Sequence, residues 1–275
     1  MVSQVIDRRS ILSLAAAAAA VGSLPTHAAG ESAQDHMRMM TTLPPDAPKV
    51  AMLIYSQMVA LDLIGPLTVF NVARFDTQLV WKTKAPVASV EGLPFAANLT
   101  FDQCPADLDV LFVPGGIMGT LACMNDPEVR GFLADRGSRA KWVTSVCTGG
   151  LVIAAAGLLR GYDATAYWPI ADLLPLMGAR HVDARVVRDR NRMTGGGVTA
   201  GIDFGLALVA AMRGEELARR AALTIEYSPQ PPIRNGTPAE AGPERSTAMR
   251  QSRKWMDDQA RLVAEQAGRR LGTLG

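Results

Sequence analysis

Short apolar runs alternate with segments of helical character over most of this chain. Residues 49–55 form a continuous apolar run of strand length, and residues 108–116 form a second such pattern that ends in a glycine pair. Runs of this kind are typical of strands that are covered on both faces, and their alternation with helices is typical of a parallel sheet. The pattern predicts an α/β fold with a mostly parallel sheet. A polar hairpin is predicted at residues 184–197, with its turn near 189–191.

Residues that typically begin helices lie between these apolar runs. Gly65 and Pro66 form a good first turn for a helix that follows the first strand. Asp126 and Pro127 have the character of a cap and a first helical residue. Thr199 is placed to cap a strongly apolar helix in the last third of the chain. We therefore predict helices that begin near residues 65, 127 and 200.

The last segment, residues 244–275, has the pattern of one amphipathic helix. Its basic residues number 7 and its acidic residues 4. Five of its apolar residues recur at steps of 7, 4, 3 and 4 and fall on one narrow helical face: Met249, Met256, Ala260, Val263 and Ala267. This pattern predicts a helix that docks on the core or packs in a dimer, rather than one that binds a membrane.

The N-terminus has the pattern of an export signal. Paired arginines, Arg8 and Arg9, precede an apolar stretch at residues 11–24, and Thr26-His27-Ala28 resembles a signal-peptidase site. The paired arginines resemble the twin-arginine type of signal. The apolar stretch is shorter than the ~20 residues that span a bilayer. We therefore expect export to the periplasm or secretion; the alternative is an uncleaved apolar helix.

These patterns divide the chain into four parts. We predict a signal peptide at 1–29, a linker at 30–48, a catalytic domain at 49–243 and a C-terminal helix at 244–275. The whole chain has 275 residues, of which 48% are hydrophobic, so it is long enough to bury a full core. Its 28 Lys and Arg residues nearly balance 26 Asp and Glu residues. This balance, without a dense basic stripe, gives no support to nucleic-acid binding.

Cysteine and histidine counts limit the chemistry that the domain can perform. The chain has three cysteines, Cys104, Cys123 and Cys147, and an odd number leaves at least one free thiol. His181 is the only one of its three histidines that falls in the predicted domain. No Cys-x-x-Cys pair occurs, so the sequence supports neither a zinc site nor a thioredoxin-like site. The scarcity of histidine argues against most kinds of metal site, so we expect no metal.

Cys147 stands at a sharp predicted corner. An apolar strand ends at Cys147, and Thr148-Gly149-Gly150 leads directly into a helix. This resembles a nucleophile elbow, and the N-terminus of a helix is expected to lower the pKa of a thiol. The alternative is a buried structural cysteine, since cysteine is among the most buried residue types.

Two further features are expected at the same edge of the sheet, because ligands of parallel α/β sheets gather at the carboxyl ends of strands. Gly115 and Gly116 end one strand and could direct backbone N–H groups at a developing anion. Asp62 follows the first strand among apolar neighbours. It is either a cap for the helix beginning at Gly65 or a carboxyl with a perturbed pKa that serves as acid–base partner of Cys147.

Together these segments resemble the DJ-1/PfpI superfamily and, more narrowly, its isonitrile (isocyanide) hydratases. The segments are LDLIGPLTVF, DVLFVPGG, SVCTGGLVIAAAGLLRGYDAT, MTGGGVTAGIDFGLALV and IEYSPQPPIRNGTP. The resemblance implies a flavodoxin-like three-layer sandwich, also similar to class I glutamine amidotransferases. It further implies a homodimer that needs no cofactor and acts on a small-molecule isonitrile.

The resemblance also implies roles for individual residues. Cys147 matches the family's nucleophile and Asp62 its acidic partner, while Thr148 matches a residue whose hydroxyl and backbone N–H help to bind substrate. Gly115 and Gly116 match the backbone donors opposite the sulfur. Ile117 and Tyr167 are expected to complete the substrate site.

One departure from the family pattern concerns Tyr167. Related proteins often have Thr-Thr-His-Trp where this chain has Thr165-Ala166-Tyr167-Trp168, so the histidine is replaced by tyrosine. The replacement weakens a Cys–His hydrolase interpretation. The sequence favours an isonitrile hydratase that works through a cysteine thioimidate. The alternatives are a glyoxalase or deglycase, a redox sensor that uses Cys147 without turnover, and a regulator fused to a DNA-binding module, for which the C-terminal segment is too short.

Overall fold

The computed structural model describes residues 42–274 of the chain. The predicted signal peptide at 1–29 and the first part of the predicted linker lie outside the described residues. Residues from Leu43 onward form one compact unit, to which the C-terminal helix also belongs. In this part of the chain no helix combines the length and apolar character needed to cross a membrane.

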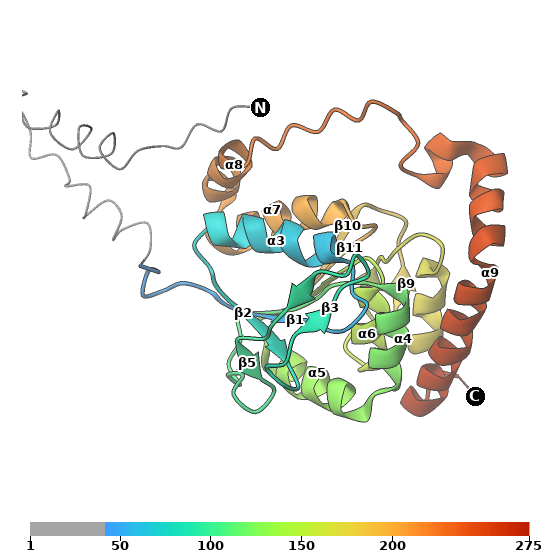
Figure 1. Cartoon of the computed structure of the whole chain (residues 1–275), viewed down its shortest axis with the longest axis horizontal. Helices are drawn as coiled ribbons and strands as arrows, with labels where there is room; N and C mark the ends of the chain where they lie inside the picture. The colour runs from blue at the N-terminus through green and yellow to red at the C-terminus, as the bar shows by residue number, and fades with distance from the viewer. Residues whose placement is uncertain (1–41, 275) are drawn as a thin grey trace, which may run out of the picture. The chain divides into compact units, whose positions relative to one another are not determined.

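The part of the chain that the structure describes is built around a seven-stranded sheet (Figure 1). The order of its strands is β10-β11-β7-β6-β1-β2-β5. Its neighbouring strands run parallel, except that β10 and β11 form an antiparallel hairpin. The prediction of a mostly parallel sheet is confirmed, and so is the hairpin. The strands are β1 (Lys49–Leu53), β2 (Asp76–Trp81), β5 (Leu99–Thr100), β6 (Val110–Val113), β7 (Trp142–Val146), β10 (Val186–Asp189) and β11 (Arg192–Gly195).

Helices cover both faces of this sheet, so the predicted three-layer sandwich is confirmed. One face carries α3 (Ala60–Val72), α7 (Ala200–Arg213) and α8 (Glu215–Thr224), which contact one another (Figure 1). The other face carries α4 (Ile117–Asn125), α5 (Pro127–Arg139) and α6 (Gly149–Ala155). Asp126 caps α5 as predicted, since its carboxylate accepts hydrogen bonds from the N–H groups of Glu128 and Val129.

The C-terminal helix α9 (Pro238–Leu271) packs outside this second helical layer. It contacts α4, α6 and the short 3-10 helix η2 (Ala171–Met177). The backbone departs from helical geometry at Gly242 (φ 78°), so the long continuous part begins close to the predicted residue 244. Ala260 and Ala267 of the predicted apolar face are fully buried, whereas Met249 is exposed. The sequence predicts either docking on the core or packing in a dimer. The C-terminal part of this face, which includes Ala260 and Ala267, docks on the core.

Two short strand pairs complete the unit. β8 (Asp163–Ala164) pairs with β9 (Arg180–His181), and β3 (Val87–Ala88) pairs with β4 (Pro94–Phe95). The β3–β4 hairpin hydrogen-bonds to the loop after β1, where Gln57 N–H donates to Ala88 and Val90 N–H to Met58, each at 2.8 Å. This hairpin therefore fixes the loop that leads into α3.

Three details differ from the sequence-based expectations. Helix α3 begins at Ala60 rather than at Gly65, because the carboxylate of Glu91 in the β3–β4 hairpin accepts the Ala60 N–H (3.1 Å) from outside the helix. Thr199 does occupy the N-cap position of α7, but its side chain makes no capping hydrogen bond and accepts one from Arg185 instead. Helix α4 was not predicted.

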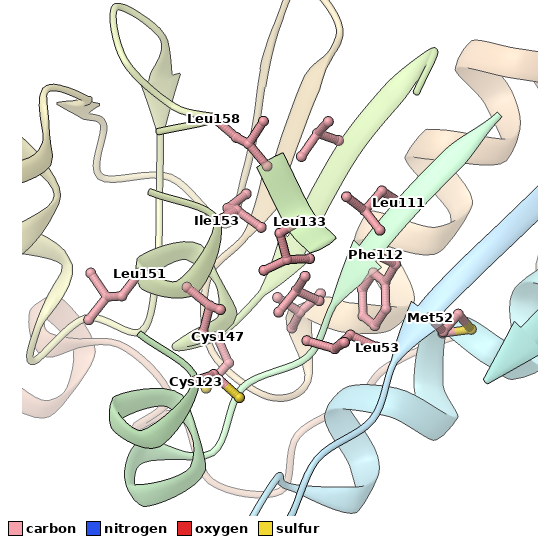
Figure 2. Close-up of a cluster of buried hydrophobic side chains, with 14 of the residues drawn as sticks. Met52, Leu53, Leu111, Phe112, Cys123, Leu133, Cys147, Leu151, Ile153 and Leu158 are labelled. Atoms are coloured by element: carbon pink, nitrogen blue, oxygen red, sulfur yellow. The ribbon is translucent and has the colours of Figure 1, made fainter. Parts of the chain in front are cut away.

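Apolar side chains pack on both faces of the sheet; the ring centroid of Phe112, for example, lies 5.6 Å from that of Phe204 in α7. Figure 2 shows Met52 and Leu53 of β1, Phe112 of β6, Leu133 of α5 and Ile153 of α6 in one buried cluster. Interiors packed to crystal-like density hold their surrounding elements rigidly. The carboxyl ends of β1, β6 and β7, which are neighbours in the sheet, are therefore held in fixed positions.

Candidate active site

Cys147 lies on a strained corner between β7 and α6. Its φ is +59°, a left-handed conformation that costs a residue with a side chain about 1–2 kcal/mol. Hydrogen bonds hold both sides of the residue: its N–H donates to Gly195 (3.1 Å) and Gly196 (2.7 Å), and its C=O accepts from Tyr167 N–H (3.2 Å). The structure therefore contains the elbow that the sequence predicts, and the surrounding backbone stabilises its strained conformation.

Glycine is required directly after this corner. A Cβ atom at position 149 would lie 2.3 Å from the carbonyl oxygen of Val113 and 2.5 Å from that of Pro114. The first turn of α6 thus passes directly against the end of β6. This contact brings the segment after β6 next to Cys147.

Asp62 is the third residue of α3 and its side chain is fully buried. Its Oδ2 atom accepts a hydrogen bond from Gly115 N–H at 3.0 Å, while its Oδ1 atom has no hydrogen-bond partner. The residue at the N-cap of α3 is Val59. The alternative that Asp62 caps a helix beginning at Gly65 is therefore wrong, and the alternative of a buried carboxyl with a perturbed pKa is what the structure has.

Gly115 is the point at which the predicted site residues meet. A Cβ atom placed there would lie 2.6 Å from the backbone nitrogen of Thr148, 2.7 Å from Asp62 Oδ2 and 2.8 Å from Cys147 Cβ. Only glycine leaves room for the elbow and the carboxylate to lie on either side of this backbone. The segments after β1, β6 and β7 therefore converge on one residue.

The neighbouring Gly116 is also in contact with the elbow. Its N–H donates to Thr148 Oγ1 at 2.8 Å, and its φ of +140° favours glycine. Both glycine N–H groups thus donate to side chains of the site, Gly115 to Asp62 and Gly116 to Thr148. A substrate atom that uses these donors has to replace those side-chain oxygens. Ile117 follows as the half-buried first residue of α4.

Burial dominates the ionisation of both reactive groups. It raises the pKa of Asp62 to about 7, although the Cys147 thiol and the Gly115 N–H stabilise the carboxylate. Burial also raises the pKa of Cys147 well above its ordinary value, and the charge of Asp62 raises it further. The Thr148 N–H opposes this shift but is outweighed. The expectation of a lowered thiol pKa is therefore wrong, because complete burial outweighs the N-terminus of a seven-residue helix.

Tyr167, which stands where relatives often have histidine, contacts the elbow through its backbone. Its half-buried ring lies beneath the guanidinium of Arg253, whose Cζ is 5.0 Å from the ring centroid. Arg253 belongs to α9 and also pairs with Asp257 at 3.4 Å. Its charge lowers the pKa of Cys147, but less than burial and Asp62 raise it. The C-terminal helix thus brings a cation toward the site.

Sequence reasoning missed Arg253, Tyr55 and Thr120. Tyr55 and Thr120 are buried and belong to a hydrogen-bonded chain of hydroxyl groups that reaches Thr148. Thr120 lies in the unpredicted helix α4, and Arg253 lies on a helix that was interpreted only by its apolar face. Arg253 reaches the site from a distant segment, whereas Tyr55 and Thr120 lie near Asp62 and Gly116 in the chain but carry no pattern that marks them.

Over the residues that the structure describes, no hydrogen bond joins His181 or the other two cysteines to Cys147 or Asp62. Cys123 is nevertheless close enough to Tyr55 to raise the pKa of the Tyr55 hydroxyl. His181 is exposed on β9. Cys104 and Cys123 are buried free thiols, and burial raises the pKa of Cys123 to about 12. Among residues 42–274, no group of three or more His, Cys, Asp or Glu side chains could hold a metal ion. Within the described part of the chain, Cys147 and Asp62 are thus the pair that can perform acid–base and nucleophilic chemistry.

Comparison with known proteins places this arrangement in a family. Residues 48–211 match the model of the DJ-1/PfpI family. The chain belongs to the DJ-1/PfpI family. It is 45% identical over 194 residues to isonitrile hydratase from Pseudomonas putida, which covers 70% of this chain and 84% of that protein. It is also 29% identical over 144 residues to deglycase PH1704 from Pyrococcus horikoshii, covering 52% of this chain and 86% of that protein.

Solved structures of DJ-1/PfpI proteins have the same architecture. A THiJ/PfpI family protein from Pseudomonas syringae superposes with a TM-score of 0.77 at 42% identity. The match covers 88% of this chain and 97% of that one. The predicted family and fold class are therefore confirmed.

The raised pKa of Asp62 gives this DJ-1/PfpI chain a pH-dependent stability. A carboxyl whose folded pKa lies above its unfolded value of 3.8 opposes folding increasingly as the pH rises from about 4 to 7, and fully above that. We expect Asp62→Asn to stabilise the protein relative to the parent, with an advantage that grows by about 2–3 kcal/mol between pH 5 and pH 8. Urea unfolding at both pH values measures it.

A matched control is Asp107→Asn. Asp107 is exposed, and its hydrogen bond with Lys49 lowers the pKa of its carboxyl, so its replacement should give no such advantage at pH 8. An Asp62→Asn advantage that is the same at both pH values would show that the carboxyl titrates normally in the folded protein.

Proposed function

We propose that this protein hydrates organic isonitriles to N-substituted formamides. One observation carries the proposal: a buried cysteine on a strained elbow has a single carboxyl as acid–base partner, and the pKa of that carboxyl is about 7. A group with such a pKa can accept and donate protons at neutral pH. The 45% identity to an isonitrile hydratase supports the same activity.

In the first half of the proposed reaction, the Cys147 sulfur attacks the terminal carbon of R–N≡C. Asp62 accepts the thiol proton and delivers it to that same carbon. The S–H bond breaks, C–S and C–H bonds form, and the product is the thioimidate R–N=CH–S–Cys147. Since the thiol is protonated at rest, the attack depends on Asp62 acting as the base.

In the second half, water adds to the thioimidate carbon. Asp62 accepts a proton from the water and passes it to the nitrogen, which gives R–NH–CH(OH)–S–Cys147 and returns Asp62 to its carboxylate form. The C–S bond then breaks, the hydroxyl proton returns to sulfur through Asp62, and R–NH–CHO leaves. In the net reaction, R–N≡C and water give the formamide R–NH–CHO, so the stoichiometry needs no cofactor. Gly115, Gly116, Ile117, Thr148 and Tyr167 are proposed to surround the substrate.

The test is formamide production by the purified full-length chain from one aliphatic and one aromatic isonitrile, followed by the formyl proton signal in NMR. We expect turnover by the parent and none by Cys147→Ala. Cys104→Ala should remain within a few-fold of the parent, because that buried thiol lies outside the elbow. Absence of formamide from every isonitrile tried would refute the proposed activity.

A deglycase or glyoxalase activity is the second candidate, because a named deglycase is 29% identical to this chain. We expect methylglyoxal to be consumed much more slowly than isonitriles, since the chain has tyrosine where a histidine is frequent in the family. A redox sensor needs a readily oxidised thiolate. The raised pKa and burial of Cys147 make that role the weakest of the three.

A further inference from the structure

Three buried hydroxyl groups form one hydrogen-bonded chain that ends beside the elbow. Tyr55 Oη lies 3.3 Å from Thr120 Oγ1, and Thr120 Oγ1 lies 2.7 Å from Thr148 Oγ1. All three residues are at most 2% exposed. The three come from separate segments, so their arrangement depends on the fold and not on the local sequence.

The direction of the chain follows from counting protons. The Tyr55 hydroxyl donates its one proton to the Pro114 carbonyl at 2.7 Å, so toward Thr120 it can only accept. At the other end, Thr148 Oγ1 accepts the Gly116 N–H at 2.8 Å. Thr120 stands between them and has one proton, which it can donate either to Tyr55 or to Thr148.

These two choices have different consequences for Thr148. If Thr120 donates to Tyr55, Thr148 donates to Thr120 and its proton is used within the chain of hydroxyl groups. If Thr120 donates to Thr148, both lone pairs of Thr148 Oγ1 are filled, by Thr120 and by Gly116. The Thr148 proton is then confined to the one remaining tetrahedral position. Accepting a second hydrogen bond also makes that hydroxyl a stronger donor.

The geometry points to Thr120 as a positioning residue, which turns its proton toward Thr148 so that the Thr148 hydroxyl donates a hydrogen bond to the atom that gains charge beside the Cys147-bound carbon. Thr148 follows Cys147 directly in the chain. The inference rests on the proposed function in one respect: with an isonitrile, that atom is the imine nitrogen of the thioimidate as water adds.

The test compares Thr120→Val, which removes the hydroxyl at nearly constant shape, with Thr120→Ser, which restores it. The matched control is Thr144→Val, because Thr144 is also fully buried and its hydroxyl donates only to the Leu111 carbonyl at 3.0 Å. For isonitrile hydration we expect Thr120→Val to lower kcat by about tenfold, the effect of one hydrogen bond in the transition state, with little change in KM. Thr120→Ser and Thr144→Val should stay within about threefold of the parent.

A second readout does not depend on isonitriles. Acylation of Cys147 by 4-nitrophenyl acetate develops an oxyanion that needs a donor, whereas alkylation by iodoacetamide does not. Thr120→Val should lower the ratio of acylation to alkylation rates by about tenfold, and Thr144→Val should leave it unchanged. A parent that makes no formamide would refute the proposed function, while this ratio would still decide the role of Thr120.

The variant Tyr55→Phe tests whether Thr120 positions the Thr148 hydroxyl or only supports the fold. Without the Tyr55 hydroxyl, Thr120 has only Thr148 left as an acceptor, so we expect the rate ratio to stay at or above the parent value. The unpaired Pro114 carbonyl should meanwhile lower stability. Equal ratios for Thr120→Val and Thr144→Val, or a ratio in Tyr55→Phe as low as in Thr120→Val, would overturn the inference.

Discussion

Asp62→Asn is expected to lower isonitrile turnover by at least about 10²-fold, the smaller end of the range for general acid–base catalysis. The asparagine oxygen can still accept the Gly115 N–H, so the elbow and the helix start should keep their positions. What is lost is the group that we propose to carry protons between sulfur, carbon and water. Steady-state formamide assays at pH 7 to 8 measure the loss.

The same variant should make Cys147 easier to alkylate. The charge of Asp62 raises the pKa of the thiol, so its removal lowers that pKa and speeds reaction with iodoacetamide at a given pH. Asp107→Asn is the matched control, since it makes the same change at an exposed carboxylate that pairs with Lys49, and it should leave turnover and alkylation at the parent rates. Turnover by Asp62→Asn near the parent rate would refute the proton-shuttle role.

Gly115→Ala should be nearly as damaging, for a steric reason. The new Cβ would lie 2.6–2.8 Å from the Thr148 nitrogen, an Asp62 oxygen and the Cys147 Cβ, closer than real Cβ contacts allow. All three neighbours are buried and cannot move aside. We expect destabilisation of about 1–3 kcal/mol and a loss of turnover on the order of 10²-fold from displacement of the reacting groups.

Gly131→Ala provides the comparison for this variant. Gly131 lies in α5 with nothing within 4 Å of the new Cβ, so alanine there should leave turnover unchanged. Helix propensity should stabilise the protein by up to about 1 kcal/mol. Denaturant unfolding together with formamide assays tests both variants. Parent-like turnover by Gly115→Ala would show that the site tolerates a wider separation of Cys147 and Asp62.

The features that could be predicted from sequence are those with local causes. Continuous apolar runs give buried parallel strands, and a cysteine followed by glycines between a strand and a helix gives the elbow. The start of α3 could not be predicted in this way, because the Glu91 carboxylate that accepts the Ala60 N–H is 31 residues away in the chain. Likewise, Arg253 approaches Tyr167 only because α9 folds back onto the second helical layer.

The direction in which the pKa of the Cys147 thiol is shifted also could not be predicted from local sequence. A helix N-terminus is a local feature and argues for a lower pKa of Cys147. Burial depends on all the residues packed around the sulfur, and here burial is the main reason that the pKa is raised. Local pattern thus identified the elbow, while the resting protonation state of its thiol required the whole fold.

Folding also changes how accessible and how reactive the three thiols are. The hydrogen bonds that join the site link residues 53 and 32 positions apart, and long-range contacts of this kind form slowly compared with local ones. Until they form, the chain has three accessible thiols of ordinary acidity, whereas in the folded chain all three are buried and the pKa of each is raised, which slows their reaction. Pulse labelling with a thiol reagent during refolding would therefore follow assembly of the sheet, and oxidative damage would fall mainly on molecules that have not finished folding.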